Sequence, residues 1–145
     1  AGLSEYAYVT PGAAKLLLPP TVKDTWASMA GCAAKTVLRA FERAGRIRPG
    51  STVVVQGSGA LGIFATAVAK IAGAGRVITV GAPAVRLELA ARFGADAVVD
   101  FRDRPVVDQV LELTGGLGAD HVFDFAGAPS VGPDAVGMAA QRGTI

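Results

Sequence analysis

Three closely spaced glycines stand between an apolar, β-branched run and a helical pattern. Gly57, Gly59 and Gly62 follow residues 52–55 (TVVV) and precede residues 63–71, whose apolar side chains recur at helical spacing. A strand, a G-x-G-x-x-G turn and a helix in this order are typical of a dinucleotide phosphate site. Glycine makes up 19 of the 145 residues, so the interpretation depends on the flanking strand and helix.

Each glycine has a steric role in such a site. Gly57 permits a tight turn, Gly59 lets the main chain approach a diphosphate with no Cβ between them, and Gly62 lets the helix pack close to the strand. The anion is expected on the free N–H groups of the first helical turn, where the helix dipole favours negative charge. The residues predicted to hold the diphosphate are Gly57, Ser58, Gly59, Ala60, Leu61 and Gly62.

Composition excludes several other classes of protein. A hydrophobic share of 51% with 18% charged residues argues against disorder and favours strands covered on both faces. The net charge of +2 is carried by scattered residues with no aromatic and basic cluster, so no nucleic-acid partner is expected. Lys70 and several glycines interrupt the most apolar run before it could span a membrane. One cysteine excludes an internal disulfide, and a cytoplasmic location is the default expectation.

Strand and helix patterns alternate after the glycine turn. The segments are a strand at 77–80, a helix at 85–93, a strand at 97–100, a helix at 105–114, a strand at 121–127, a helix at 131–140 and a strand starting at 144–145. Short loops between alternating strands and helices predict an α/β fold with a doubly wound parallel sheet, the Rossmann arrangement. Since the last strand would stop after two residues, we expect a sheet truncated at its C-terminal end.

The region before the glycine turn has a different pattern. Residues 1–10 and 15–18 read as two short strands separated by a turn, and they are too few to form a domain. Asp24 is expected to cap a helix running to about Ala30, and a second helix is expected over 32–44, ending at Gly45. We therefore expect this region to be the end of a domain that lies upstream.

The cofactor's ribose is expected at the end of the second strand of the sheet. An NAD-preferring site places Asp or Glu about 20 residues after the glycines, but Gly81 stands 19 positions after Gly62. The missing carboxylate removes a charge that would repel a 2′-phosphate, and Arg86 offers a positive partner. Gly81, Ala82 and Pro83 nevertheless include no Arg or Lys directly after the strand. The sequence leaves the choice between NAD and NADP open.

Several motifs together resemble the medium-chain, zinc-containing alcohol dehydrogenase family. They are residues 31–36 (GCAAKT), 48–50 (RPG), 53–62 (VVVQGSGALG), 86–90 (RLELA), 93–96 (FGAD) and 114–120 (TGGLGAD). The resemblance covers nearly the whole chain. It implies that residues 1–31 are a crossing segment from a missing N-terminal catalytic domain and that residues 32–145 are an incomplete dinucleotide-binding domain.

The resemblance also implies roles for individual residues. Cys32, which is 25 positions before Gly57, matches the third protein ligand of the family's catalytic zinc. The residues implied to lie against the cofactor are Thr36 and Leu61 at the nicotinamide, Gly81, Ala82 and Arg86 at the adenosine ribose, and Ala126 and Gly127 at the end of the fourth strand. The remaining zinc ligands would come from the missing domain. The single histidine, His121, matches no family ligand and is expected to be structural.

The implied activity is hydride transfer between an alcohol or carbonyl substrate and a nicotinamide cofactor. A zinc ion with an open coordination position would polarise the substrate oxygen. The intact protein is expected to be a homo-oligomer, whereas this chain alone is expected to bind dinucleotide weakly and to show no turnover.

Two other functions stay open at this point. One is a zinc-independent quinone or enoyl reductase of the same superfamily, against which Cys32 argues. The other is a non-enzymatic module that senses dinucleotides, which the catalytic-domain character of the residues before Cys32 disfavours.

Overall fold

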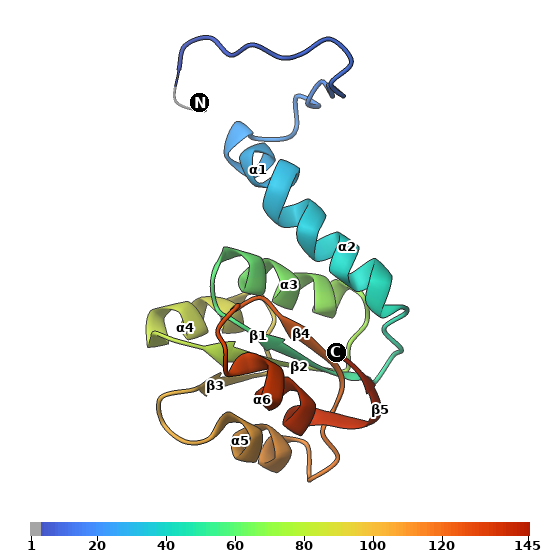
Figure 1. Ribbon diagram of the computed structural model, residues 1–145, viewed down its shortest axis with the longest axis vertical. Helices are drawn as coiled ribbons and strands as arrows, with labels where there is room; N and C mark the ends of the chain where they lie inside the picture. Colours follow the sequence, from blue (N-terminus) through green and yellow to red (C-terminus); the bar gives the residue numbers. More distant parts are fainter. Residues whose placement is uncertain (1–3) are drawn as a thin grey trace.

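The fold is a five-stranded parallel sheet covered by helices on both faces, as predicted (Figure 1). The computed structural model describes residues 4–145. The strands are β1 (Thr52–Gln56), β2 (Arg76–Gly81), β3 (Ala97–Asp100), β4 (Ala119–Asp124) and β5 (Ala139–Thr144). Their order in the sheet is β3-β2-β1-β4-β5, so the chain leaves β1 in one direction and returns to its other side for β4. Ligands of such sheets bind where the strand order reverses, which here is beside β1.

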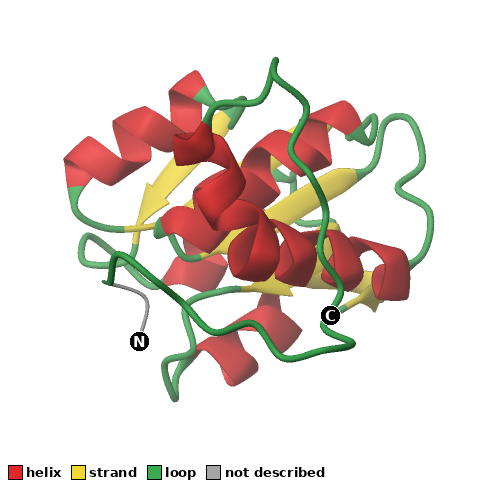
Figure 2. Ribbon diagram, turned by 90° about the horizontal axis from the view of Figure 1, so that it is seen from above, coloured by secondary structure: helices red, strands yellow, loops and turns green. Residues whose placement is uncertain are grey.

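Helical segments surround the sheet, and all except the first two contribute buried side chains. They are α1 (Asp24–Met29), a π-helical segment η1 (Ala30–Ala34), α2 (Lys35–Ala44), α3 (Ala60–Ile71), α4 (Ala84–Arg92), α5 (Val106–Leu113) and α6 (Val131–Met138). Figure 2, which looks from above, shows helices lying over the strands. No helix among residues 4–145 is long and apolar enough to cross a membrane.

Side chains of β1 alternate between two separate cores. Val53 and Val55 point to a cluster that contains Val37 and Phe41 of α2, whereas Val54 points to a cluster built with α5 and α6. All three valines of β1 are fully buried. This period of two is what a pleated strand requires, and it explains why a continuous apolar run suits a strand covered on both faces.

The two N-terminal strands predicted over 1–10 and 15–18 are wrong for the described residues. Residues 4–23 contain no strand, and residues 1–3 lie outside the described part of the chain. Leu16 and Leu17 are 88% and 95% exposed, so these side chains do not pack on a sheet or core formed by residues 4–145. Figure 1 shows it extending away from the sheet together with α1. Alternation of apolar residues does not make a strand without a partner.

The predicted helices before β1 are present, with different ends. Lys23 is the N-cap of α1 and Asp24 its first residue, and no side-chain cap hydrogen bond is formed. The second helix does not begin at Cys32, because η1 joins α1 to α2 without a break. Gly45 ends α2 as predicted, with a φ of 82° that favours glycine.

The fourth and fifth strands differ from the predictions. β4 ends at Asp124 instead of Gly127, because the Asp124 carboxylate accepts hydrogen bonds from Ala126 N at 2.7 Å and Gly127 N at 3.2 Å and turns the chain. β5 starts at Ala139 and spans six residues, where only residues 144–145 were expected. The predicted helix over 131–140 correspondingly ends at Met138.

Candidate functional site

A cavity of about 450 Å³ opens at the carboxyl ends of the parallel strands. Its walls come from the ends of β1 and β2, from the loops that follow β3 and β4, and from the first turns of α4, α5 and α6. The lining residues are Gln56, Gly57, Ser58, Val80, Gly81, Ala82, Arg86, Phe101, Pro105, Val106, Val107, Ala126, Ala128, Ser130, Val131 and Asp134. This is the edge at which open parallel sheets bind their ligands.

The glycine turn forms one wall of the cavity, and its geometry explains two of the glycines. Gly57 has a φ of 108° and donates its N–H to Val80 O at 2.8 Å, which ties the turn to β2. A Cβ on Gly62 would lie 1.8 Å from Gly57 O, so α3 packs against the turn with no room for a side chain. Gly59 is the N-cap of α3, and a Cβ there would meet no atom within 4 Å.

Ser58 joins the glycine turn to the end of β2. Its Oγ donates to Ala82 O at 3.1 Å and accepts from Ala82 N at 3.2 Å. A Cβ on Gly81 would lie 2.2 Å from Ser58 Oγ and 2.4 Å from Ser58 Cβ. Position 81 therefore has no room for a carboxylate while Ser58 stays where it is. This is a steric reason for the missing acidic residue that the sequence alone did not show.

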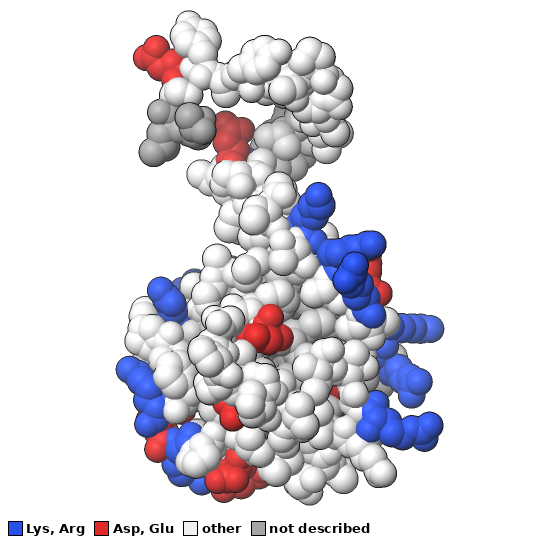
Figure 3. Space-filling model, in the orientation of Figure 1, with Lys and Arg blue, Asp and Glu red and all other residues white. Residues whose placement is uncertain are grey.

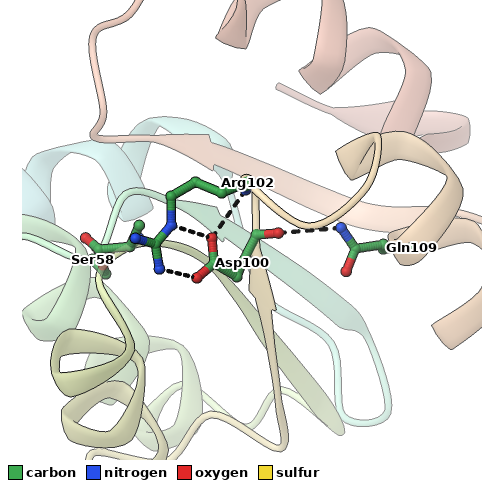
Figure 4. Close-up of polar contacts among 5 residues, drawn as sticks. Ser58, Asp100, Arg102 and Gln109 are labelled. Atoms are coloured by element: carbon green, nitrogen blue, oxygen red, sulfur yellow. Dashed lines mark hydrogen bonds and ion pairs between the residues drawn. The ribbon is translucent and has the colours of Figure 1, made fainter.

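The nearest carboxylate to Gly81 along the sheet is already neutralised. Asp100 pairs with Gly81 in the register of β2 and β3. Hydrogen bonds from the Arg102 side chain and main chain lower the pKa of Asp100 to about 2, and Figure 4 shows the guanidinium facing the carboxylate. The Gln109 side chain donates to the main-chain oxygen of Asp100 at 3.3 Å. Asp100 is thus ionised with its charge compensated, and Arg86 stays as a cation in the cavity wall.

One polar atom in the cavity wall lacks a partner. Gln56 ends β1 and is 2% exposed, yet its Oε1 accepts no hydrogen bond within residues 4–145. A buried acceptor without a donor costs about 1–3 kcal/mol. A ligand with a donor group could satisfy it. The lining includes both polar and apolar residues, which suits an organic molecule with both kinds of surface.

Cys32 and Thr36 lie outside this cavity, in a separate shallow hollow. They are one helical turn apart, on η1 and α2, and they share the hollow with Lys35, Arg39 and Arg43. Cys32 is exposed. Residues 4–145 contain no group of three or more His, Cys, Asp or Glu side chains that could hold a metal ion. A catalytic zinc needs three protein ligands, so Cys32 by itself does not make a zinc site.

The cavity brings together six of the residues predicted from the sequence. These are Gly57, Ser58, Gly81, Ala82, Arg86 and Ala126. Gly59, Ala60 and Gly62 belong to the adjoining start of α3, and Gly127 follows Ala126 in the loop after β4. Leu61 packs against the core cluster that contains β1 and α2.

Apart from Ala126, the walls supplied by the loops after β3 and β4 and by the first turns of α5 and α6 were not predicted. They include Phe101, Val107, Ser130 and Asp134. The only available signal was position, because these residues follow strands whose carboxyl ends meet at one edge. They carry no motif of their own.

Comparison with known proteins gives one consistent result. The family model described as zinc-binding dehydrogenase matches residues 60–145. An alcohol dehydrogenase from Cupriavidus necator is 37% identical over 111 residues, which are 76% of this chain and 30% of that protein. An NADP-dependent isopropanol dehydrogenase from Thermoanaerobacter brockii is 38% identical over 99 residues, 68% of this chain and 28% of that protein.

The fold is also found in solved structures. An alcohol dehydrogenase from Thermotoga maritima superposes with a TM-score of 0.82 at 29% identity, covering 88% of this chain and 36% of that one. The chain therefore spans about a third of the length of the proteins it matches.

Proposed function

Because this chain belongs to the zinc-binding dehydrogenase family, we propose that it is the nicotinamide-cofactor-binding part of a dehydrogenase that acts on alcohols or carbonyl compounds. One observation carries the proposal. The glycine turn between β1 and α3 forms a wall of the cavity at the carboxyl edge of the sheet, where a dinucleotide's diphosphate can reach main-chain N–H groups. When bound, the nicotinamide ring supplies hydride chemistry to such an enzyme.

The residues of this chain bind and orient the cofactor. The first hydrogen bond within α3 runs from Ile63 N to Gly59 O at 2.9 Å, so the N–H groups of Ala60, Leu61 and Gly62 precede it and are free for the diphosphate. Gly59 leaves the approach open because it has no side chain. Thr36 and Leu61 stay predictions for the nicotinamide end, as do Ala126 and Gly127 for a cofactor contact after the fourth strand.

Zinc enters the proposal only through Cys32. The family resemblance assigns Cys32 one ligand position, and its exposed thiol can reach an ion held by groups outside residues 4–145. The described residues do not complete a zinc site, so no catalytic step is derived through the metal. We accordingly expect the 145-residue chain to show no alcohol oxidation. Measurable alcohol oxidation by this chain would contradict the proposal that the other zinc ligands come from outside residues 4–145.

For the cofactor form, we propose NADP(H) over NAD(H). Position 81 has no room for the carboxylate that would bind the 2′-hydroxyl, Asp100 is neutralised by Arg102, and Arg86 adds a positive charge to the wall. Arg86 is the one cation among the lining residues and can pair with a 2′-phosphate, while the one lining carboxylate, Asp134, comes from α6. The relative from Thermoanaerobacter brockii is described as NADP-dependent, which supports this choice.

Titration of the 145-residue chain with NADPH and NADH tests both the proposed cofactor binding and the proposed preference for NADP(H). We expect NADPH to bind more tightly, and Arg86→Gln to weaken NADPH binding about tenfold while NADH binding stays unchanged, since one charge-assisted hydrogen bond is lost. Arg92→Gln, at the other end of α4, is the matched control for charge. Binding of neither nucleotide would refute the cofactor proposal. Equal binding of both, insensitive to Arg86→Gln, would refute only the preference.

A further inference from the structure

A second pocket lies at the opposite edge of the sheet from the cofactor cavity. It has a volume of about 320 Å³ and sits at the amino ends of β1 and β4, beside β5. Its lining residues are Ala44, Arg46, Arg48, Ser51, Asp120, His121, Arg142 and Thr144. No predicted site residue belongs to it, and the proposed function does not use it.

The pocket carries an excess of positive charge. Arg46 and Arg48 come from the loop before β1 and Arg142 from β5, and none forms an ion pair with a carboxylate of residues 4–145. The one carboxylate in the lining, Asp120, accepts a hydrogen bond from Thr52 N at 2.8 Å. Figure 3 shows Lys and Arg side chains gathered on the side of the molecule where α2 ends and β5 lies. Three arginines and one aspartate thus line the pocket.

A buried polar atom at the pocket also lacks a partner. The side chain of His121 lines the pocket but is only 9% exposed, and its Nδ1 has no hydrogen-bond partner within residues 4–145. Burial lowers the pKa of His121, and Arg48 lowers it further against the opposing effect of Asp120. The imidazole is therefore neutral at pH 7 and has one N–H to donate. An unpaired buried donor or acceptor costs about 1–3 kcal/mol, which a ligand atom can recover.

We propose that this pocket is a second binding site, specific for a tetrahedral oxyanion of the phosphate class. The guanidinium forks of Arg46, Arg48 and Arg142 match phosphate oxygens, and the neutral imidazole of His121 donates a further hydrogen bond when its one proton is on Nδ1. A dianion balances the net charge of three arginines and one aspartate, whereas a carboxylate ligand leaves it unbalanced. The pocket is smaller than the cofactor cavity and suits a free phosphate or a phosphate monoester, not a dinucleotide.

The single histidine makes the site directly observable. Titration of the ¹⁵N-labelled 145-residue chain with inorganic phosphate, followed by NMR at the imidazole nitrogens, reports on His121 alone. We expect a saturable shift of Nδ1. Arg48→Gln and Arg142→Gln should each weaken phosphate binding about tenfold, because each removes a charge-assisted hydrogen bond. Arg92→Gln, which removes the same charge from α4 outside the pocket, should leave binding unchanged.

Further titrations identify the class of ligand and distinguish this pocket from the cofactor cavity. Phenyl phosphate in place of inorganic phosphate shows whether a monoester fits, and acetate shows whether a carboxylate does. NADPH affinity should be the same in Arg142→Gln as in the wild type, and an unchanged amide spectrum shows that this variant is folded. The proposal is overturned if His121 shows no saturable shift, if Arg142→Gln binds phosphate like the wild type, or if acetate binds as tightly as phosphate.

Discussion

Replacing Gly62 with alanine tests the packing that shapes the glycine turn. The added Cβ would lie 1.8 Å from Gly57 O and 2.7 Å from Gly57 C, both main-chain atoms. The carbonyl would have to withdraw by about 1.6 Å, the difference from the 3.4 Å at which ordinary contact begins. It cannot withdraw freely, because Gly57 N is bonded to Val80 O at 2.8 Å and a Cβ on Gly57 would be only 3.0 Å from Ala126 N.

The size of the effect follows from two opposing contributions. Overpacking against a fixed main chain destabilises by about 3 kcal/mol, the upper part of the usual range. Alanine inside a helix recovers about 0.5–1 kcal/mol relative to glycine. We therefore expect Gly62→Ala to lower the free energy of unfolding by about 2 kcal/mol. For a domain of this length that corresponds to a melting temperature lower by roughly 6 °C.

Gly59→Ala is the matched variant for the assay. Its Cβ meets no atom within 4 Å, and the φ of −79° suits any residue, so its stability should stay within about 0.5 kcal/mol of the wild type. Its NADPH affinity should nevertheless fall, because the methyl group stands where the diphosphate approaches. Urea unfolding and nucleotide titration of both variants make the comparison. If Gly62→Ala unfolds at the wild-type urea concentration, the packing argument is refuted.

Two further predictions concern the interior and the acid response. The hydroxyls of Thr66 and Thr79 are fully buried and 2.8 Å apart, so Thr66→Val should destabilise by about 1–3 kcal/mol, and adding Thr79→Val should restore part of that loss in a double-mutant cycle measured by urea unfolding. Burial raises the pKa of Asp96, but hydrogen bonds from Lys70 and Val77 N outweigh it and leave the pKa lowered. The folded protein should therefore lose stability as the pH falls below about 3.8, and Asp96→Asn should remove this part of the pH dependence while costing less than about 1 kcal/mol at pH 7. An acid limb that is unchanged in Asp96→Asn would contradict the second prediction.

The sequence predicted the structure well where an element depends on residues that are close together in the chain. The strand over 97–100 was predicted with its observed ends, and the turn at Gly57 was expected from the strand and helix around it. β1, which leads into the turn, is buried on both faces, whereas β3 buries Val99 and leaves Val98 40% exposed; in both strands the β-branched run favours an extended chain. The doubly wound sheet followed from their alternation.

The failures lie where structure depends on a distant partner. The N-terminal apolar alternation gives no strand because residues 4–23 find no partner strand within residues 4–145, and β5 forms because β4 offers an edge to residues 139–144. The sequence did not reveal why glycine stands at position 81, and the reason is again a distant partner. It depends on the side chain of Ser58, which is 23 positions away in the sequence and in contact in space.

The contact between Ser58 and Gly81 makes these two positions interdependent. A designer who wants to convert the nucleotide preference by introducing Asp at position 81 would find no space for its Cβ, which would overlap Ser58 Oγ at 2.2 Å. Exchanging Ser58 for glycine at the same time removes the two shortest contacts, leaves the main-chain nitrogen of residue 58 at 3.0 Å, and gives up the two hydrogen bonds to Ala82. A shift of preference by this route therefore needs a change at position 58 before or together with the change at position 81.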